Sequence, residues 1–258
     1  MLTPPFDAHA LRSWLGAEPP AALQDFLLGL QERVGDRAAA FDDALDELTH
    51  TRLSDQDDVD VDLPLDVVPV LDGPDFVLGF LDAAPELRAL DRPCFILLGG
   101  QLRPFAPTMA QGLSRLVRNR LERADEEEPD MEALHWVQTV LPAPDETRFR
   151  WPPSLPNGHR HVDTLDGLGV LAPHRAFDPR VLRGDPNLSL DELDQWVTHL
   201  LHEGNPGSAL VVLRDALYAG RRQPSTWNRL GRALEETFLT LGRASCAYRA
   251  RRRIARHG

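Results

Sequence analysis

Apolar residues recur at helical spacing in three successive stretches of the first 50 residues. The first stretch has Leu11, Trp14 and Leu15 on one face, with Asp7 as a possible N-cap and Gly16 as a stop. The second begins after two prolines, ends at Gly35 and has one apolar stripe, formed by Leu23, Phe26, Leu27, Leu30 and Val34. The third carries Phe41, Ala44, Leu45 and Leu48 on one face. Each stripe predicts an amphipathic helix whose apolar face packs on the core.

Three apolar runs of strand length follow, at residues 67–71, 76–81 and 94–98. The turn signal Asp72-Gly73-Pro74-Asp75 separates the first two, and Gly99-Gly100 closes the third. Both alternating faces of the middle run are apolar, so we expect a central strand that is covered on both sides. Thr108-x-x-Gln111, a capping-box pattern, opens a further amphipathic helix. Together these elements predict an α+β fold, with a small, mainly antiparallel sheet flanked by helices.

The middle of the chain has a different composition. Residues 123–130 are strongly charged and look like a surface linker, and residues 135–141 fit either a short strand or the end of a helix. Eight prolines between Pro142 and Pro186 indicate little regular structure. We therefore predict three parts: an α+β domain at 1–125, a proline-rich connector at 126–188 that packs on its neighbours, and a helical unit at 189–258. Trp151, at the start of Trp151-Pro152-Pro153, is either a core anchor or pins the connector to the sheet.

The last seventy residues repeat a helical pattern. Small residues at Gly204, Ala209 and Ala216 follow a helix with Leu193, Trp196, Val197 and Leu200 on one side. Trp227-x-x-Leu230-Gly231 comes next, then Leu234, Gly242 and Ala247. This order resembles the tetratricopeptide pattern of paired helices, in which small residues let two helices approach closely. The resemblance implies a small all-α, helical-repeat-like unit, and two repeats alone should need to pack on the first domain.

The charge and the cysteines limit the function classes. The formal net charge is -12 and the pI is about 5.2, which argues against nucleic acid as a direct ligand, because phosphate binding needs a basic stripe. The same charge is also explained by solubility alone. No lysine occurs, which suggests a high-GC bacterial source. Cys94 and Cys246 are expected to be structural thiols, and the absence of a signal peptide or membrane span predicts a cytoplasmic protein.

The order of motifs up to residue 121 resembles the SUKH superfamily of fungal cell-wall regulators and bacterial immunity proteins. The first motif is Pro19-Pro20-x-x-Leu23-x-x-Phe26-Leu27, followed by Val68-Pro69-Val70. The next two are Phe76-Val77-Leu78-Gly79-Phe80-Leu81-Asp82 and Pro107-Thr108-Met109-Ala110-Gln111-Gly112-Leu113. The resemblance implies a non-enzymatic protein-binding domain of the kind that neutralises toxins, often nucleases. An acidic protein is compatible with that role, because it can occlude a basic active-site surface and speed the encounter with it.

Carboxylates are the candidate partner-binding groups. They are Asp55, Asp57, Asp58, Asp60, Asp62, Asp72 and Asp75. As a partner-facing patch, the run from Asp55 to Asp62 would mimic the spacing of phosphates, whereas a plain solvated loop is the commoner explanation. The run does not fit a calcium loop, since the glycine at the sixth position and the closing Glu are missing.

Two further groups have alternative explanations. His159-x-His161-x-Asp163 would place three possible zinc ligands on one side of a strand, but the set is incomplete and three polar surface residues are the commoner case. The basic tail of Arg249, Arg251, Arg252, Arg253 and Arg256 either complements the dipole of the last helix or binds an acidic partner.

No phosphate loop, nucleophile elbow or Cys–His pair occurs in the sequence, and we expect no cofactor and no catalytic residue. The first hypothesis is therefore a non-enzymatic immunity-type protein that occludes a toxin. The alternatives are a regulatory scaffold that recruits a peptide through its helical repeats, and a metal-dependent hydrolase that uses His159, His161 and Asp163.

Overall fold

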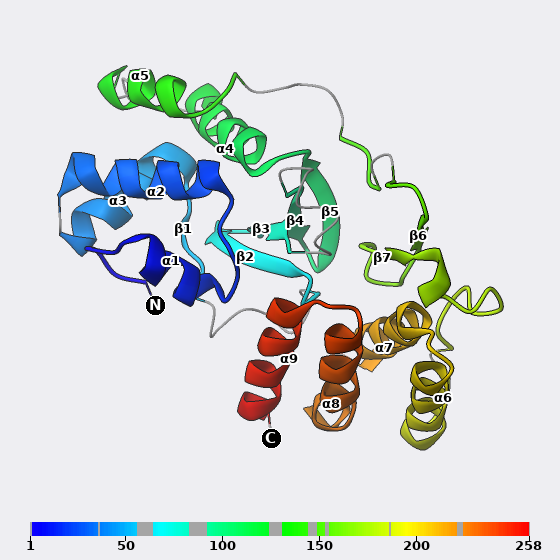
Figure 1. The fold of residues 1–258 in the computed structure, drawn as a ribbon. Helices are drawn as coiled ribbons and strands as arrows, with labels where there is room; N and C mark the ends of the chain where they lie inside the picture. Colours follow the sequence, from blue (N-terminus) through cyan, green and yellow to red (C-terminus); the bar gives the residue numbers. More distant parts are fainter. Residues whose placement is uncertain are drawn as a thin grey trace.

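The structure is a computed structural model, and it describes residues 2–35, 37–55, 64–82, 92–123, 131–143, 149–152, 155–185, 187–220 and 224–257. The helices are α1 (Ala8–Leu15), α2 (Ala21–Val34), α3 (Ala38–Thr49), α4 (Met109–Arg123), α5 (Met131–Val140), α6 (Leu190–His202), α7 (Pro206–Gly220), α8 (Pro224–Thr240) and α9 (Ala244–His257), with a short 3-10 helix, η2 (His174–Ala176). The strands are β1 (Arg52–Leu53), β2 (Val67–Asp72), β3 (Phe76–Leu81), β4 (Cys94–Leu98), β5 (Gln101–Ala106), β6 (His159–Val162) and β7 (Val170–Pro173). The protein has the predicted α+β fold (Figure 1).

The central sheet is an antiparallel meander in which the five strands lie in sequence order, β1 to β5. β3 is the middle strand, as its apolar character on both faces predicted. Gly99 and Gly100 both have positive φ angles, 57° and 73°, so they form the tight two-residue turn between β4 and β5. The sequence pattern did not predict β1, which has only two residues, or β5, whose alternation is interrupted by Pro104.

Helices α1 to α5 form one core with the face of the sheet to which Val68, Val70, Leu78 and Phe80 belong. Helix boundaries follow the sequence signals: the Asp7 carboxylate accepts a hydrogen bond from the Ala10 backbone N–H, and Thr108 does the same for Gln111. Residues 135–141, which fitted either a strand or a helix end, lie mostly in α5, and Trp136 stacks on Phe26 of α2.

The opposite face of the sheet is covered by the connector. Trp151 packs edge-on against Phe95 at 5.1 Å between ring centroids, and Leu168 and Leu171 join Val67, Leu81 and Leu97 in a second apolar cluster. The expectation of little regular structure between Pro142 and Pro186 is wrong for the middle of that segment. Residues 159–173 form the β6–β7 hairpin, and η2 follows it.

The β6–β7 hairpin lies between the sheet and the C-terminal helices (Figure 1). Leu171 faces the sheet, whereas its neighbours Val170 and Ala172 belong to the core of α6 to α9. This division follows from the alternation of side chains along a strand. The hairpin therefore packs through apolar side chains on both the sheet and the C-terminal helices.

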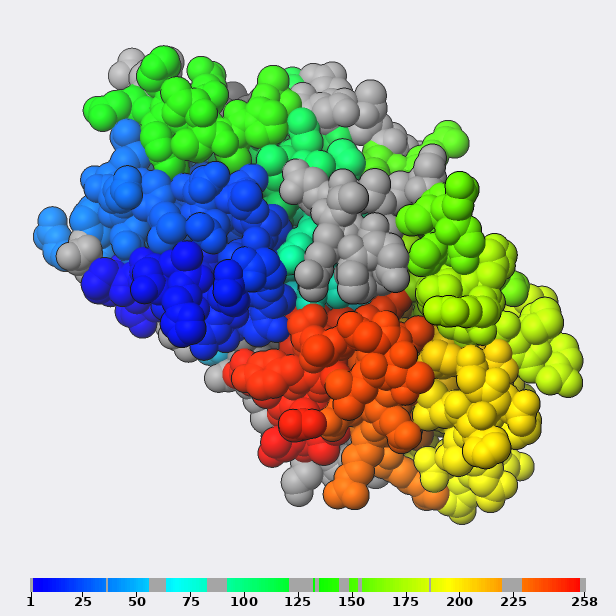
Figure 2. Space-filling model, in the orientation of Figure 1, coloured from blue at the N-terminus to red at the C-terminus, as the bar shows by residue number. Residues whose placement is uncertain are grey.

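Helices α6 to α9 form the C-terminal helical unit, with its own core. Gly231 of α8 lies so close to α9 that an added Cβ would be 2.3 Å from Ile254 Cγ1, which is the close approach expected of a small residue at this position. In Figure 2, α9 borders the N-terminal helices, and the ring of Tyr248 lies against Gly16. Among the described residues, no helix combines the length and the apolar character needed to cross a membrane.

Candidate functional site

The structure describes three of the seven candidate partner-binding carboxylates: Asp55, Asp72 and Asp75. The other four, Asp57, Asp58, Asp60 and Asp62, lie outside the described residues. Arg52 pairs in register with Asp72, and the Ser54 N–H donates to the Val70 carbonyl oxygen, so Asp55, two residues after β1, lies toward the start of β2. Asp55 comes three residues after Arg52, the partner of Asp72. At about 3.3 Å per residue of extended chain, Asp55 and Asp72 are roughly 10 Å apart along the strand direction. Asp72 is partly buried and lies 4.0 Å from Arg52, whereas Asp75 is exposed in the turn.

A second acidic surface, which the sequence reasoning missed, lies on α3. Asp42, Asp43, Asp46 and Glu47 are all exposed, and the helix contains no basic residue. Helix α3 leads within three residues into β1, where Arg52 reaches Asp72. The signal was present in the sequence, because the polar face of this amphipathic helix is uniformly negative. We call α3 together with the β2–β3 turn the acidic face.

The structure does not support a metal site at His159, His161 and Asp163. Among the described residues, no group of three or more His, Cys, Asp or Glu side chains could hold a metal ion. The ring of His161 is held in the protein interior, with Nε2 3.0 Å from the Leu168 carbonyl oxygen and the Trp151 ring edge-on to it. Trp151 Nε1 donates to the same carbonyl oxygen at 2.6 Å. These residues hold the loop of the β6–β7 hairpin against the sheet.

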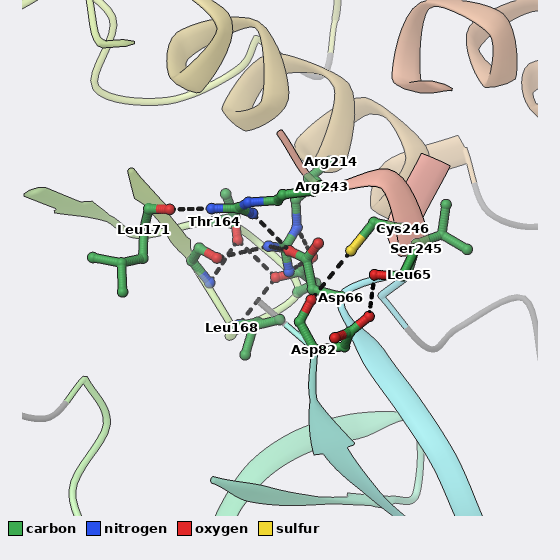
Figure 3. Close-up of polar contacts among 12 residues, drawn as sticks. Leu65, Asp66, Asp82, Thr164, Leu168, Leu171, Arg214, Arg243, Ser245 and Cys246 are labelled. Atoms are coloured by element: carbon green, nitrogen blue, oxygen red, sulfur yellow. Dashed lines mark hydrogen bonds and ion pairs between the residues drawn. The ribbon is translucent and has the colours of Figure 1, made fainter. Parts of the chain in front are cut away.

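A cluster of buried charged side chains lies where the sheet, the hairpin and the helical unit meet (Figure 3). Arg214 of α7 is buried and lies between two carboxylates, with Nη1 3.0 Å from Asp66 and Nη2 2.6 Å from Asp166. Nη1 also donates to the Gly169 carbonyl oxygen at 2.6 Å. Burial alone would lower the pKa of Arg214, but Asp166 and Asp66 raise it above its ordinary value, so the guanidinium is charged.

Arg243 extends this network toward the N-terminus of α9. Its guanidinium lies 3.7 Å from the Asp66 carboxylate and donates to the Leu171 carbonyl oxygen of β7. Asp66 comes directly before β2, so two arginines of the helical unit converge on one end of the sheet. We call the contacts of Arg214, Arg243 and Arg249 with Asp66 and Asp82 the ionic junction.

Asp82, directly after β3, occupies the N-terminal end of α9. Its Oδ2 accepts hydrogen bonds from Ser245 and from Arg249 Nη1 at 3.0 Å. Helix α9 has no acidic residue of its own in its first turn, so Asp82 supplies the negative charge that the helix dipole favours there. Arg249 Nε also donates to the Leu65 carbonyl oxygen at 3.0 Å. Asp82 is thus the residue that the sheet contributes to fix the start of α9.

The basic tail does not act as one group. Arg249 belongs to the ionic junction, Arg251 pairs with Glu235 on α8, and Arg252 lies over the Tyr248 ring. The alternative in which the tail complements the dipole of the last helix is therefore wrong for Arg249, because its guanidinium pairs with Asp82 at the N-terminal end of α9. The Arg256 side chain lies outside the described residues.

Both cysteines are free and buried, as expected. Cys94 Sγ contacts the Thr108 carbonyl oxygen and Met109 under α4, whereas Cys246 Sγ points into the ionic junction, 3.3 Å from the Asp82 carbonyl oxygen. Burial raises the pKa of the Cys246 thiol, so it is protonated.

Asp215 of α7 joins two loops near the ionic junction. Its carboxylate accepts backbone hydrogen bonds from Leu165 at 2.7 Å and from Gly184 at 2.8 Å. Burial raises the pKa of Asp215, while the two backbone donors oppose that effect. This carboxylate has a structural explanation, as do those of Asp66, Asp82 and Asp166.

No family model matches the sequence, and no curated protein matches it significantly. The resemblances to the SUKH superfamily and to tetratricopeptide repeats therefore remain predictions.

Proposed function

We propose that this protein is a non-enzymatic binding protein that occludes a basic surface of a partner protein, with the immunity type of bacterial toxin neutralisation as its role. The observation that carries the proposal is the acidic face. The four exposed carboxylates of α3 share their helix with no Lys or Arg, and Asp46 lies 3.5 Å from His50 at its C-terminal end. The chain then enters β1, where Arg52 lies 4.0 Å from Asp72 at the end of β2.

The location of the acidic face supports a binding role. Helix α3 is anchored by Phe41, Leu45 and Leu48 in the first core, so its exposed side is held in place before any partner arrives. A rigid acidic surface suits the basic substrate-binding surface of a nuclease, because complementary charge speeds encounter and fixes orientation. The partner class is thus a protein with a basic active-site surface.

The contacts of the buried ionisable groups also support a binding role without catalysis. Strongly perturbed groups in a cleft are the usual mark of a catalytic site. Here Arg214 and Asp215 are occupied by partners that join the parts of the fold. These contacts explain their perturbed pKa values, so neither group is proposed as catalytic.

Co-expression with a toxin encoded beside this chain tests the proposal. The expected result is restored growth of the host and a complex that co-purifies at defined stoichiometry. The double variant Asp43→Asn/Glu47→Gln should lose protection. Glu203→Gln/Glu236→Gln makes the same change in net charge at exposed positions on the helical unit and should keep it. Normal protection by the α3 variant, or no binding by the wild-type protein, would refute the role.

A regulatory scaffold is the second candidate, and the arrangement of α6 and α8 favours it. These two helices lie next to each other, with Arg229 paired to Asp191, as the first helices of neighbouring repeats do. If that surface recruits a peptide, the Glu203→Gln/Glu236→Gln variant should change binding, while the α3 variant should not. The same pair of variants therefore distinguishes the two functions.

A further inference from the structure

The two parts of the molecule have separate apolar cores. The first lies between α1 to α5 and the sheet, and the second lies among α6 to α9 and the hairpin. Leu65, which comes shortly before β2, packs in the core of the helical unit, and the ring of Tyr248 on α9 lies against Gly16 between α1 and α2. The closest contacts between the helical unit and the sheet are nevertheless those of the ionic junction. Polar contacts between domains resemble those of transient complexes, and relative motion is expected of them.

The β6–β7 hairpin, unlike the ionic junction, makes apolar contacts with both parts of the molecule. Leu168 and Leu171 attach it to the sheet, and Val162, Val170 and Ala172 attach it to the helical unit. A movement that preserves both apolar contacts must therefore pivot near the hairpin. The part farthest along the junction, where Arg249 reaches Asp82 and the Gly16 carbonyl oxygen, would separate most.

The ionic junction is also incompletely satisfied. Within the part of the chain that the structure describes, Asp66 Oδ1 and Arg243 Nε are buried and have no hydrogen-bond partner. A partly satisfied buried network carries the full desolvation cost of such atoms. Opening would hydrate them and so offset much of the loss of the ion pairs. Opening therefore costs less free energy than it would if every atom of this buried network were satisfied.

We infer that the ionic junction is a latch, and that the helical unit opens from the sheet as a body about the β6–β7 hairpin. This inference does not depend on the identity of a binding partner. Opening breaks the contacts of Arg249 and Ser245 with Asp82 and withdraws Leu65 from the second core, but it leaves the rest of both apolar cores intact. It is a local transition of lower free energy than global unfolding.

The two native cysteines report on this motion. Cys246 belongs to the second core, at the side that meets the sheet: its Sγ lies 3.3 Å from both the Asp82 carbonyl oxygen and Arg249 Nη2. Opening removes Asp82 from this contact and so exposes the thiol to a reagent. Cys94 lies between β4 and α4 in the first core, where opening leaves it covered and only unfolding of that core exposes it. Alkylation of the native protein followed by mass spectrometry should label Cys246 at least about tenfold faster than Cys94, which corresponds to about 1.4 kcal/mol. Equal rates for the two thiols would overturn the inference.

Variants of α9 sharpen the test. Arg249→Met should speed the labelling of Cys246 at least about tenfold without changing that of Cys94, because it removes the partner of a buried carboxylate. Arg251→Met, the matched control on the same helix, breaks only the surface pair with Glu235 and should change neither rate. Asp82→Asn is a milder second variant in case Arg249→Met does not fold. An unchanged Cys246 rate in both latch variants would contradict the inference.

Hydrogen exchange separates opening from fraying of α9. If the helical unit moves as a body, the amides of α9 stay protected under conditions in which Cys246 is labelled, since α9 remains packed on α8 at Gly231. Loss of α9 protection in step with Cys246 labelling would show that the helix frays, and the latch would then be wrong.

Discussion

Replacing Arg214 with Met tests whether the buried charges hold the three parts of the fold together. Arg214 carries the only positive charge within 3.0 Å of Asp166 and Asp66 among the described residues, and all three side chains are at least nine-tenths buried. The methionine side chain fills much of the volume but leaves both carboxylates without their closest partner.

The expected loss is about 3–5 kcal/mol, the range for removing one partner of a buried pair. Arg243 lies 3.7 Å from Asp66 and offsets part of the loss there, whereas Asp166 has no such substitute among the described arginines. For a protein of this size, each kcal/mol lowers the melting temperature by about 2–4 °C, so a fall of about 6–20 °C is expected.

Urea denaturation followed by circular dichroism, together with a thermal melt, measures the effect. Arg251→Met again serves as the control, since the Arg251 side chain is largely exposed, Glu235 keeps contact with solvent, and the midpoint should move far less than in Arg214→Met. Asp66→Asn combined with Arg214→Met should recover part of the loss, because one stranded charge is removed. A loss under about 1 kcal/mol in Arg214→Met, the range of an exposed pair, would refute the reasoning.

Three other substitutions test further contacts. Gly79→Ala should cost about 1–3 kcal/mol in urea denaturation, because an added Cβ would be 2.6 Å from the Val68 carbonyl oxygen, and an unchanged midpoint would contradict this. Trp151→Ala should cost about 3 kcal/mol and free the hairpin from the sheet; protection of the Leu168 region from hydrogen exchange would then fall, and retained protection would argue against a pinning role. The Arg180 side chain and backbone lower the pKa of Asp178 from 3.8 to about 2, so the stability from this pair is complete above pH 3.8 and is lost as the pH falls toward 2. Asp178→Asn should therefore flatten the acid limb of the stability curve, and an NMR titration giving an ordinary pKa for Asp178 would show the pair to be unimportant.

Periodicity predicted the elements whose signal is local. The stripes of α1 to α4 and the apolar runs of β2 to β4 each needed only their own residues, and the caps at Asp7 and Thr108 were readable for the same reason. β5 was missed because an edge strand with one covered face has weak alternation, and Pro104 interrupts it. The β6–β7 hairpin was missed because a high proline count was given more weight than the short alternation around His161.

The ionic junction could not be predicted, because its members are far apart in the sequence. Asp66 and Arg214 are 148 positions apart, and nothing in the local pattern of either residue indicates the other. Asp82 did belong to a predicted strand motif, but its role at the start of α9 depends on how the helical unit packs. The acidic side of α3 is a local feature of the sequence, but its carboxylates are spaced more widely than those of the run after Asp55 and are a weaker signal of a binding surface.

The salt dependence of association with a toxin that this protein neutralises on co-expression tests the central claim most directly. Association rates of the purified pair should fall at least about tenfold between about 50 mM and about 300 mM salt, because complementary surfaces are screened. Asp43→Asn/Glu47→Gln should be slower at low salt and less sensitive to salt, whereas Glu203→Gln/Glu236→Gln should behave like the wild-type protein. Rates that depend on neither salt nor the α3 carboxylates would contradict recognition through the acidic face.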